Sequence, residues 1–243
     1  MIAIAKKEIN TFFASPAGYL IIAVFLVFNG LFLWVFKAGY NIFDSGFADL
    51  AAFFELTPWI FIFLIPAISM KSFSEEKRAG TLELLLTRPL GFNELISGKF
   101  LGVFMLVFAA LLPTLLYNIT ISKLSLDSGA IDFGSIAASY FGLLFLMSAY
   151  IAIGIFASAV SRHQITAFII GIMICFFGYY GFEGLASLPV FNTSGFSVTG
   201  LGMKAHFESI SRGVLDSRDI VYFVSVSLFF LFLTKIHLKY GYR

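Results

Sequence analysis

The side chains that could carry out catalysis are few, and they stand apart from one another in the sequence. Gly98-Lys99 matches the end of a phosphate-binding loop, but the preceding glycine, Gly91, is at the wrong spacing and Phe100 stands where serine or threonine is needed. His206-Phe207-Glu208 matches the start of a zinc-deaminase pattern without its cysteine pair. The three histidines have no metal-ligand spacing. We therefore expect no catalytic residues, no cofactor and no metal site in this chain.

Two acidic residues beside apolar segments are better candidates for function. Glu55 lies five residues into one such segment, and Glu183 ends another. A carboxylate within a membrane is costly and is often retained for function, so both residues are candidates for a transport pathway. Both also stand near a membrane interface, where they could reach water and have only a structural role.

The amino-acid composition indicates that these residues belong to a membrane protein. Of the 243 residues, 59% are apolar and 12% are charged, whereas soluble domains have about 45–50% and about 25%. The mean hydropathy is +0.94. The single cysteine, Cys175, excludes an intrachain disulfide and a cysteine-rich zinc site. The net charge is +2 without a long basic block, so no nucleic-acid partner is expected. These features predict a polytopic protein in a lipid bilayer.

Six apolar segments are long enough to cross a bilayer core of about 30 Å, which takes about 20 helical residues. Their apolar positions do not alternate with polar ones, and this argues against a β-barrel. We predict an all-α integral membrane fold with six transmembrane helices, forming one domain over residues 1–243. The predicted spans are 17–36, 51–70, 100–121, 136–160, 165–182 and 220–238.

The distribution of basic residues predicts the orientation of these spans. With six spans both termini share one side, and that side holds 11 of the 16 lysines and arginines. Because basic residues are enriched on the cytoplasmic side, both termini and the 71–99 segment are expected in the cytoplasm. The 11 residues are Lys6, Lys7, Lys71, Lys77, Arg78, Arg88, Lys99, Arg162, Lys235, Lys239 and Arg243.

The N-terminal residues 1–16 are typical of an amphipathic helix at the membrane interface. Over residues 2–13 the apolar side chains gather on one face and the charged ones on the other. Pro16 and Gly18 then predict a bend before the first span. The alternative is a helix that simply extends that span.

The segment 71–99 is the most polar stretch of the chain, with nine charged residues. A charged turn over 75–78 is predicted to end at Gly80, and Thr81 is expected to cap a leucine-rich helix over 82–87 that ends at Pro89. Asn93 is expected to cap a second short helix. The face formed by Leu82, Leu85 and Leu86 needs a cover, either the bilayer or a protein partner, and such a helix is a natural docking element.

A longer segment on the outer side, 183–219, is half apolar. Residues 184–191 are too few to span a membrane but apolar enough to dip into it. A helix over 204–214 is predicted, with Phe207, Ile210 and Val214 on one face. This helix could cap the exit of a pathway or pack at the interface, and the sequence does not separate the two.

The pattern Ser74-Glu-Glu-Lys-Arg-Ala-Gly-Thr-Leu-Glu-Leu-Leu-Leu-Thr-Arg-Pro89, followed by Gly98-Lys99 at the next span, resembles the first cytoplasmic loop of the permease subunits of type-2 ABC exporters. Lys7-Glu8 followed by Phe12-Phe13 and Ser15-Pro16 resembles their connecting helix. Within that family the chain is most similar to the gliding motility-associated ABC transporter permeases of Bacteroidetes. The stretch 206–223, with His206, Asp219 and Tyr222, contributes to that likeness.

The resemblance implies a permease of the bacterial inner membrane that forms a dimer with a second permease copy or a related membrane subunit. It implies that a separate cytoplasmic ABC ATPase binds ATP and docks on the 71–99 coupling loop. The residues expected to form or shape that docking element are Glu75, Glu76, Gly80, Thr81, Leu82, Glu83, Leu85, Leu86 and Pro89.

Three functions remain open from the sequence. The first is an exporter permease, with Glu55 and Glu183 as candidate pathway residues. The second is a membrane scaffold or mechanical-coupling subunit that binds the same ATPase without moving a substrate. The third, a membrane enzyme or channel acting alone, needs a catalytic or pore-lining polar set that the sequence does not display.

Overall fold

The computed structural model describes every residue except 38, 46–48, 87–90, 125–131, 188–197 and 242–243. The described residues form helices joined by short turns, and no strand occurs among them. The elements are α1 (Ile2–Phe13), α2 (Pro16–Trp34), α3 (Ile42–Ser45), α4 (Ala51–Ser69), α5 (Lys71–Arg78), α6 (Thr81–Leu86), α7 (Phe92–Leu111), η1 (Leu112–Leu115), α8 (Leu116–Leu124), α9 (Phe133–Val160), α10 (Gln164–Phe176), η2 (Phe177–Gly181), α11 (Phe182–Ala186), η3 (Val198–Leu201), α13 (Met203–Ser211) and α14 (Ser217–Gly241).

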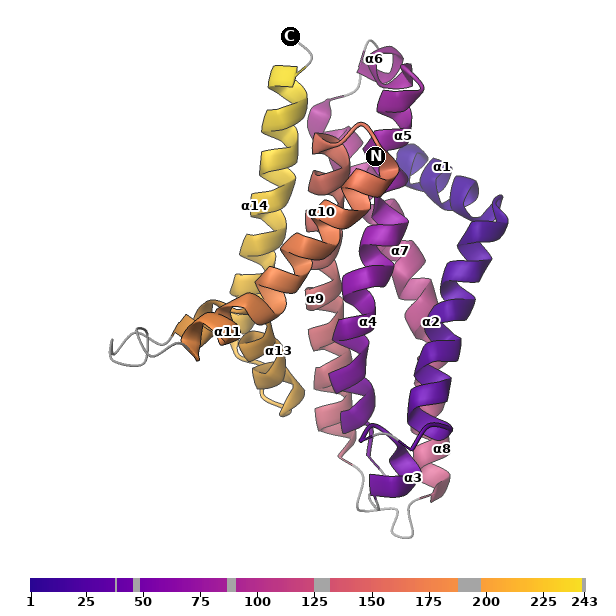
Figure 1. The fold of residues 1–243 in the computed structure, drawn as a ribbon, viewed down its shortest axis with the longest axis vertical. Helices are drawn as coiled ribbons and strands as arrows, with labels where there is room; N and C mark the ends of the chain where they lie inside the picture. Colours follow the sequence, from indigo (N-terminus) through magenta and orange to yellow (C-terminus); the bar gives the residue numbers. More distant parts are fainter. Residues whose placement is uncertain (38, 46–48, 87–90, 125–131, 188–197, 242–243) are drawn as a thin grey trace.

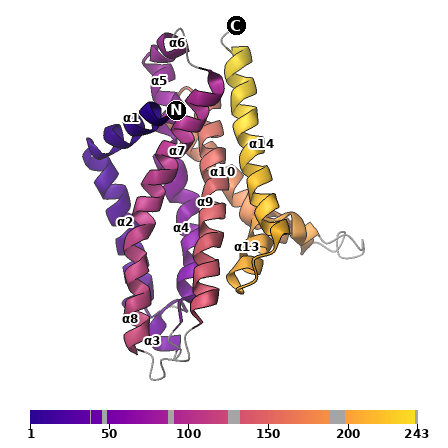
Figure 2. The same ribbon diagram turned by 180° about the vertical axis from the view of Figure 1, so that it is seen from behind.

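The all-α membrane fold predicted from the sequence is confirmed. In the part of the chain that the structure describes, five helices are long and apolar enough to cross a membrane, and the count is six if the bent pair α1–α2 is taken as one span. Both termini lie at the same end of the bundle as α5 and α6, and α3 and α8 lie at the opposite end (Figures 1 and 2). This arrangement is the one that an even number of spans produces.

The bend predicted at the start of the first span is also present. The axes of α1 and α2 differ by 74°. Pro16 begins α2, where its missing N–H costs nothing, and it holds Ser15 in an extended conformation (φ −103°, ψ 139°). At Gly18 an added Cβ would lie 2.8 Å from Cδ1 of Phe12, so the two helices meet closely only because this residue has no side chain.

Two predicted boundaries are wrong because helices continue through polar residues. Residues 75–78, predicted as a charged turn, belong to α5, which extends the run of helix from Ala51 to Arg78. The third span, predicted from residue 100, begins at Phe92, so Asn93 starts no separate helix. At a membrane surface a helix satisfies its own backbone whether or not its side chains are charged, and the end of the apolar run therefore does not mark the end of the helix.

The long helix α9 is the centre of the bundle, and α4, α7, α10, α13 and α14 all pack against it (Figure 1). Its second half, from Ala149 to Ala159, is rich in alanine, glycine and serine, and almost every side chain there is buried. Small residues let helix backbones approach closely, which is the main source of attraction between helices in lipid. The core therefore forms around a stretch of α9 in which small residues are the majority.

We expect Gly154→Ala to lower the free energy of unfolding by about 1–3 kcal/mol, because an added Cβ would lie 2.9 Å from Cβ of Ser69 and overlap its hydroxyl. Gly30→Ala is the control, since no atom lies within 4 Å of its added Cβ, and it should stabilise α2 by up to about 1 kcal/mol. A thiol-reactive dye that labels the buried Cys175 on heating measures both. Equal midpoints for the two variants would contradict the tight α4–α9 contact.

Candidate functional sites

A buried lysine joins three helices at the end of the bundle that holds the termini. The side chain of Lys99, on α7, is 1% exposed, and its Nζ lies 2.8 Å from Glu8 Oε1 on α1 and 3.0 Å from Glu76 Oε2 on α5. Lys99 also donates a hydrogen bond to the carbonyl of Ser72 (2.5 Å). Lys7 approaches Glu76 from the solvent side, at 3.3 Å from Oε1. We call Lys7, Glu8, Glu76 and Lys99 the ion-pair cluster.

The two glycines around Lys99 make this cluster possible. An added Cβ at Gly98 would lie 2.8 Å from Cβ of Ile4, and one at Gly102 would lie 2.7 Å from Cβ of Glu8. The helix α1 therefore lies in a groove on α7 whose floor is Gly98 and Gly102. Two glycines four residues apart are a common sign of close helix packing, but this spacing alone does not indicate that the N-terminal helix fills the groove.

The helix α5 is also fixed to the central helix. Ser158 on α9 donates to the carbonyl of Met70 (2.8 Å) and accepts hydrogen bonds from the backbone N–H groups of Phe73 (2.9 Å) and Ser74 (3.1 Å). Lys77 donates to the carbonyl of Ala159. A displacement of α5 is therefore transmitted to α9 through direct hydrogen bonds. Sequence reasoning missed Ser158, which looks like any small residue of a span.

Four of the predicted docking residues, Glu75, Glu76, Gly80 and Glu83, differ in their position and exposure. Gly80 adopts a left-handed conformation (φ +68°) and ends α5 as expected. Glu75 and Glu83 are exposed, whereas Glu76 belongs to the ion-pair cluster and faces inward. Replacing Glu76 is therefore expected to disturb the ion-pair cluster as well as any docking contact.

The leucine face and its cap differ from the expectation. Leu82 is buried (1% exposed) within the chain, so it is not available for a partner. Thr81 is the first residue of α6 and does not precede it, and its hydroxyl donates to the carbonyl of Glu76 (3.4 Å) at the end of α5. The side chains of Leu85 and Leu86 and the whole of Pro89 lie outside the described residues.

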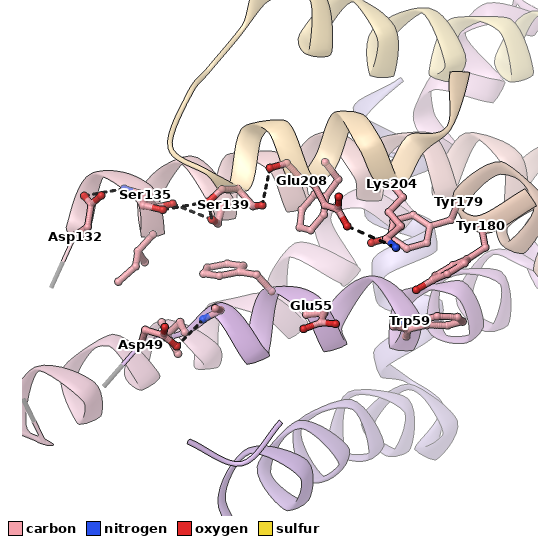
Figure 3. Close-up of a pocket in the computed structure, with 16 residues that line it drawn as sticks. Asp49, Glu55, Trp59, Asp132, Ser135, Ser139, Tyr179, Tyr180, Lys204 and Glu208 are labelled. Atoms are coloured by element: carbon pink, nitrogen blue, oxygen red, sulfur yellow. Dashed lines mark hydrogen bonds and ion pairs between the residues drawn. The ribbon is translucent and has the colours of Figure 1, made fainter. Parts of the chain in front are cut away.

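A polar cavity lies at the opposite end of the bundle, and we call it the outer pocket. Its volume is about 490 Å³, and its walls come from the starts of α4 and α9, from α13 and from η2 (Figure 3). The lining residues are Asp49, Leu50, Ala51, Phe54, Glu55, Trp59, Asp132, Ser135, Ile136, Ser139, Tyr179, Tyr180, Lys204, Phe207, Glu208 and Ser211. The pocket combines carboxylates, hydroxyls and aromatic rings.

The carboxylates of the outer pocket differ in their hydrogen-bond and ion-pair partners. Asp49 accepts a hydrogen bond from the N–H of Ala51, and Asp132 caps α9 by accepting from two backbone N–H groups. Glu208 faces Lys204 at 3.7 Å. Glu55 has no hydrogen-bond or ion-pair partner among the described residues, and in Figure 3 it lies between Asp49 and Trp59. Burial, and then the negative charge of Glu55, raise the pKa of Tyr40 above its usual value.

The second candidate pathway residue, Glu183, lies outside this pocket. Its carboxylate holds Lys204 at 2.7 and 2.9 Å. Burial is the largest influence on the pKa of Lys204 and would lower it, but the hydrogen bond to Glu183 and the charges of Glu183, Tyr180 and Glu208 together outweigh burial, so the pKa is raised. The structure thus brings Glu55 and Lys204 to one pocket and assigns Glu183 to the support of Lys204.

The helix α13 forms one wall of the outer pocket and is anchored at both ends. Ser135 and Ser139 on α9 donate to the carbonyl of Ser211 at 3.1 and 3.2 Å. At its start, Met203 is buried in the core. The helix ends at Ser211, before the predicted residue 214, because Gly213 adopts φ +88°; Val214 is exposed, unlike the buried Phe207 and Ile210. The predicted apolar face is therefore right at two positions and wrong at the third.

A histidine joins α13 to the last helix. His206 Nδ1 lies 2.6 Å from Asp219 Oδ1, and Nε2 lies 2.9 Å from the carbonyl of Gly200. The imidazole stacks on Tyr222 with ring centres 3.9 Å apart, and the Tyr222 hydroxyl donates to the carbonyl of Leu201. Three residues of the 206–223 stretch thus form one packed cluster. No group of three or more histidine, cysteine, aspartate or glutamate side chains that could hold a metal ion occurs among the described residues.

These features define a multi-pass α-helical membrane protein with a cluster of ion pairs at the end that holds the termini and a polar pocket at the other end. A family profile described as ABC-2 family transporter protein matches residues 2–240, and the chain belongs to that family. It is therefore the membrane component of an ABC transporter, a permease subunit rather than the nucleotide-binding subunit. No curated protein matches the chain.

Proposed function

We propose that this chain is the permease of an ATP-driven exporter of the bacterial inner membrane, and that a separate ABC ATPase docks on α5 and α6. The observation that carries the proposal is the ion-pair cluster, in which Lys99 ties α1 and α5 to α7 at the end of the bundle that projects α6 (Figure 1). A push on α6 and α5 would move α1 and α7 with them. This gives an ATPase a rigid element to act on.

The path from the docking element to the outer pocket runs through α9. Ser158 binds the junction of α4 and α5 near one end of α9, and Ser135 and Ser139 bind α13 near the other. A shift of α9 along or about its axis would therefore change the walls of the outer pocket. Alternating access in this protein would be a movement of α9, with α13 attached to it, relative to the start of α4.

The finer assignments follow from the resemblance of the chain. A second permease copy or a related membrane subunit would complete the transporter, since permeases of this family work as pairs. The likeness of residues 206–223 to the gliding-motility group supports a role of this exporter in gliding motility. The packed cluster of His206, Asp219 and Tyr222 supports treating that stretch as one structural feature.

The proposal is tested by reconstitution of the full chain with the ABC ATPase encoded beside its gene. We expect a stable complex whose ATP hydrolysis requires the permease, and ATP-dependent movement of substrate across the vesicle membrane. Complex formation and hydrolysis without transport of any candidate substrate would favour the scaffold function. Failure to form a complex with any ABC ATPase of the same organism would overturn the docking assignment.

A further inference from the structure

An aromatic pair separates the outer pocket from apolar surfaces of the bundle. The rings of Trp59 and Tyr180 lie with centres 4.3 Å apart, and both line the outer pocket. Tyr180 also lines an open apolar groove of about 1090 Å³ between α14 on one side and α10, η2 and α11 on the other, which we call the lateral groove. The lateral groove is lined almost wholly by apolar side chains, among them Met173, Phe176, Phe177, Leu185, Phe229 and Phe230. Tyr180 thus lines both the polar outer pocket and the apolar lateral groove.

The charge of the outer pocket favours a positively charged ligand. Four carboxylates line it (Asp49, Glu55, Asp132 and Glu208) against one ammonium, that of Lys204. Lys204 is already neutralised by Glu183, which stands outside the lining. The carboxylate of Glu55 has no hydrogen-bond or ion-pair partner among the described residues. Since no three ligating side chains there come together to hold a metal ion, an organic cation fits the pocket better than a metal.

The aromatic wall is suited to the same kind of ligand. A cation near the face of tryptophan or tyrosine is attracted by the ring quadrupole, and tryptophan is the strongest partner. The protein already uses this interaction, because Lys204 Nζ lies 4.7 Å from the centre of the Tyr180 ring. Trp59 lies in the same wall, four residues along α4 from Glu55, which places ring and carboxylate on one side of that helix (Figure 3).

We propose that the outer pocket and the lateral groove together bind an amphiphile whose headgroup carries an ammonium. The ammonium lies between Glu55 and the Trp59–Tyr180 pair, and the hydrocarbon chain lies in the lateral groove. The inference rests on the proposed function and deepens it, because it gives the class of molecule that the exporter would handle. Charge complementarity is the reason for preferring this occupant of the groove to a second copy of the chain.

Fluorescence of Trp59 provides the test, since the chain has only two tryptophans and Trp34→Phe leaves Trp59 as the single reporter. The full-length variant in neutral maltoside micelles is titrated with dodecyltrimethylammonium, and with tetramethylammonium as the headgroup alone. We expect a saturable change with the amphiphile and a half-saturation at least about a hundredfold higher with tetramethylammonium. Adding Glu55→Gln should raise the half-saturation of the amphiphile about tenfold. Tyr180→Leu should weaken binding about threefold, because it keeps the apolar volume and removes the ring face.

The control is Asp44→Asn, which removes an exposed carboxylate on α3 that does not line the outer pocket. It should leave the half-saturation unchanged within about twofold. Equal curves for Glu55→Gln and Asp44→Asn would overturn the proposal, and so would an unsaturable response. A drop in oligomeric mass for Phe229→Ala without any effect on amphiphile binding would also overturn it, because the lateral groove would then be a subunit interface.

A competition arm distinguishes the source of the amphiphile. Displacement by dioctanoyl phosphatidylethanolamine but not by dioctanoyl phosphatidylglycerol supports an aminolipid of the membrane, whereas displacement by neither supports a free cationic amphiphile. These titrations contain no ATPase. A negative result therefore contradicts the ligand class and leaves the docking assignment standing, and a failed ATPase complex leaves the binding result standing.

Discussion

Replacing Lys99 with methionine is expected to lower the free energy of unfolding by about 3–5 kcal/mol. The substitution keeps the length and the apolar stem of the side chain but removes the buried ammonium. Glu8 then has no ion-pair partner among the described residues, and Glu76 keeps only the exposed Lys7. Removing one partner of a buried ion pair destabilises a protein by more than the intact pair stabilises it, because the remaining charge is left buried with fewer partners. In this cluster one lysine serves two carboxylates, 2.8 and 3.0 Å away, so the loss is expected at the upper end.

The matched control is Lys7→Met, which removes a lysine from the same cluster. The side chain of Lys7 is 58% exposed and lies 3.3 Å from Glu76, so solvent screens the pair and its loss should cost about 0–1 kcal/mol. The thiol-dye assay on Cys175 measures the thermal midpoints of both variants. We expect the midpoint of Lys99→Met to lie on the order of 10 °C below that of the wild-type protein. Adding Glu8→Gln and Glu76→Gln should recover at least half of the loss. Equal midpoints for the two lysine variants would show that the loss of the buried Lys99 costs no more stability than the loss of the exposed Lys7.

The existence of this cluster was not predictable from one sequence. Lys7-Glu8 and Gly98-Lys99 each stood out, but 91 residues separate Glu8 from Lys99, and an ion pair leaves no periodic signal. The apolar runs, in contrast, predicted the bundle, because a helix is the structure that satisfies the backbone in lipid. The bend at Pro16 was predictable for a similar reason, since proline acts on the residues next to it.

For the outer pocket, too, the sequence predicted one part of the site and not the other. Glu55 was a candidate because a carboxylate in an apolar run is unusual, and the structure places it in the pocket. Glu183 was chosen by the same rule and lies outside, as a partner of Lys204. The rule detects a charge near lipid but does not tell whether another helix supplies a neighbour. That neighbour comes from α13, whose position depends on its packing against Gly142 of α9.

The second large effect is expected at the surface of α6. Charge reversal by Glu83→Lys should weaken binding of the cognate ATPase at least about tenfold and reduce permease-dependent ATP hydrolysis accordingly. Glu83 is exposed, unlike Leu82 and Glu76, so its replacement should leave the thermal midpoint unchanged within about 2 °C. Replacing this predicted docking residue therefore separates an effect on partner binding from an effect on folding.

Glu94→Lys is the control, because it makes the same charge change at another exposed position near the start of α7. If the ATPase docks on α6, Glu94→Lys should retain most of the binding while Glu83→Lys does not, and deletion of residues 75–89 should abolish co-purification. Equal losses for the two point variants would mean that the ATPase senses only the overall charge of this surface. Binding that survives the deletion would place the docking element elsewhere, and the ion-pair cluster would then act only to hold α1 on α7.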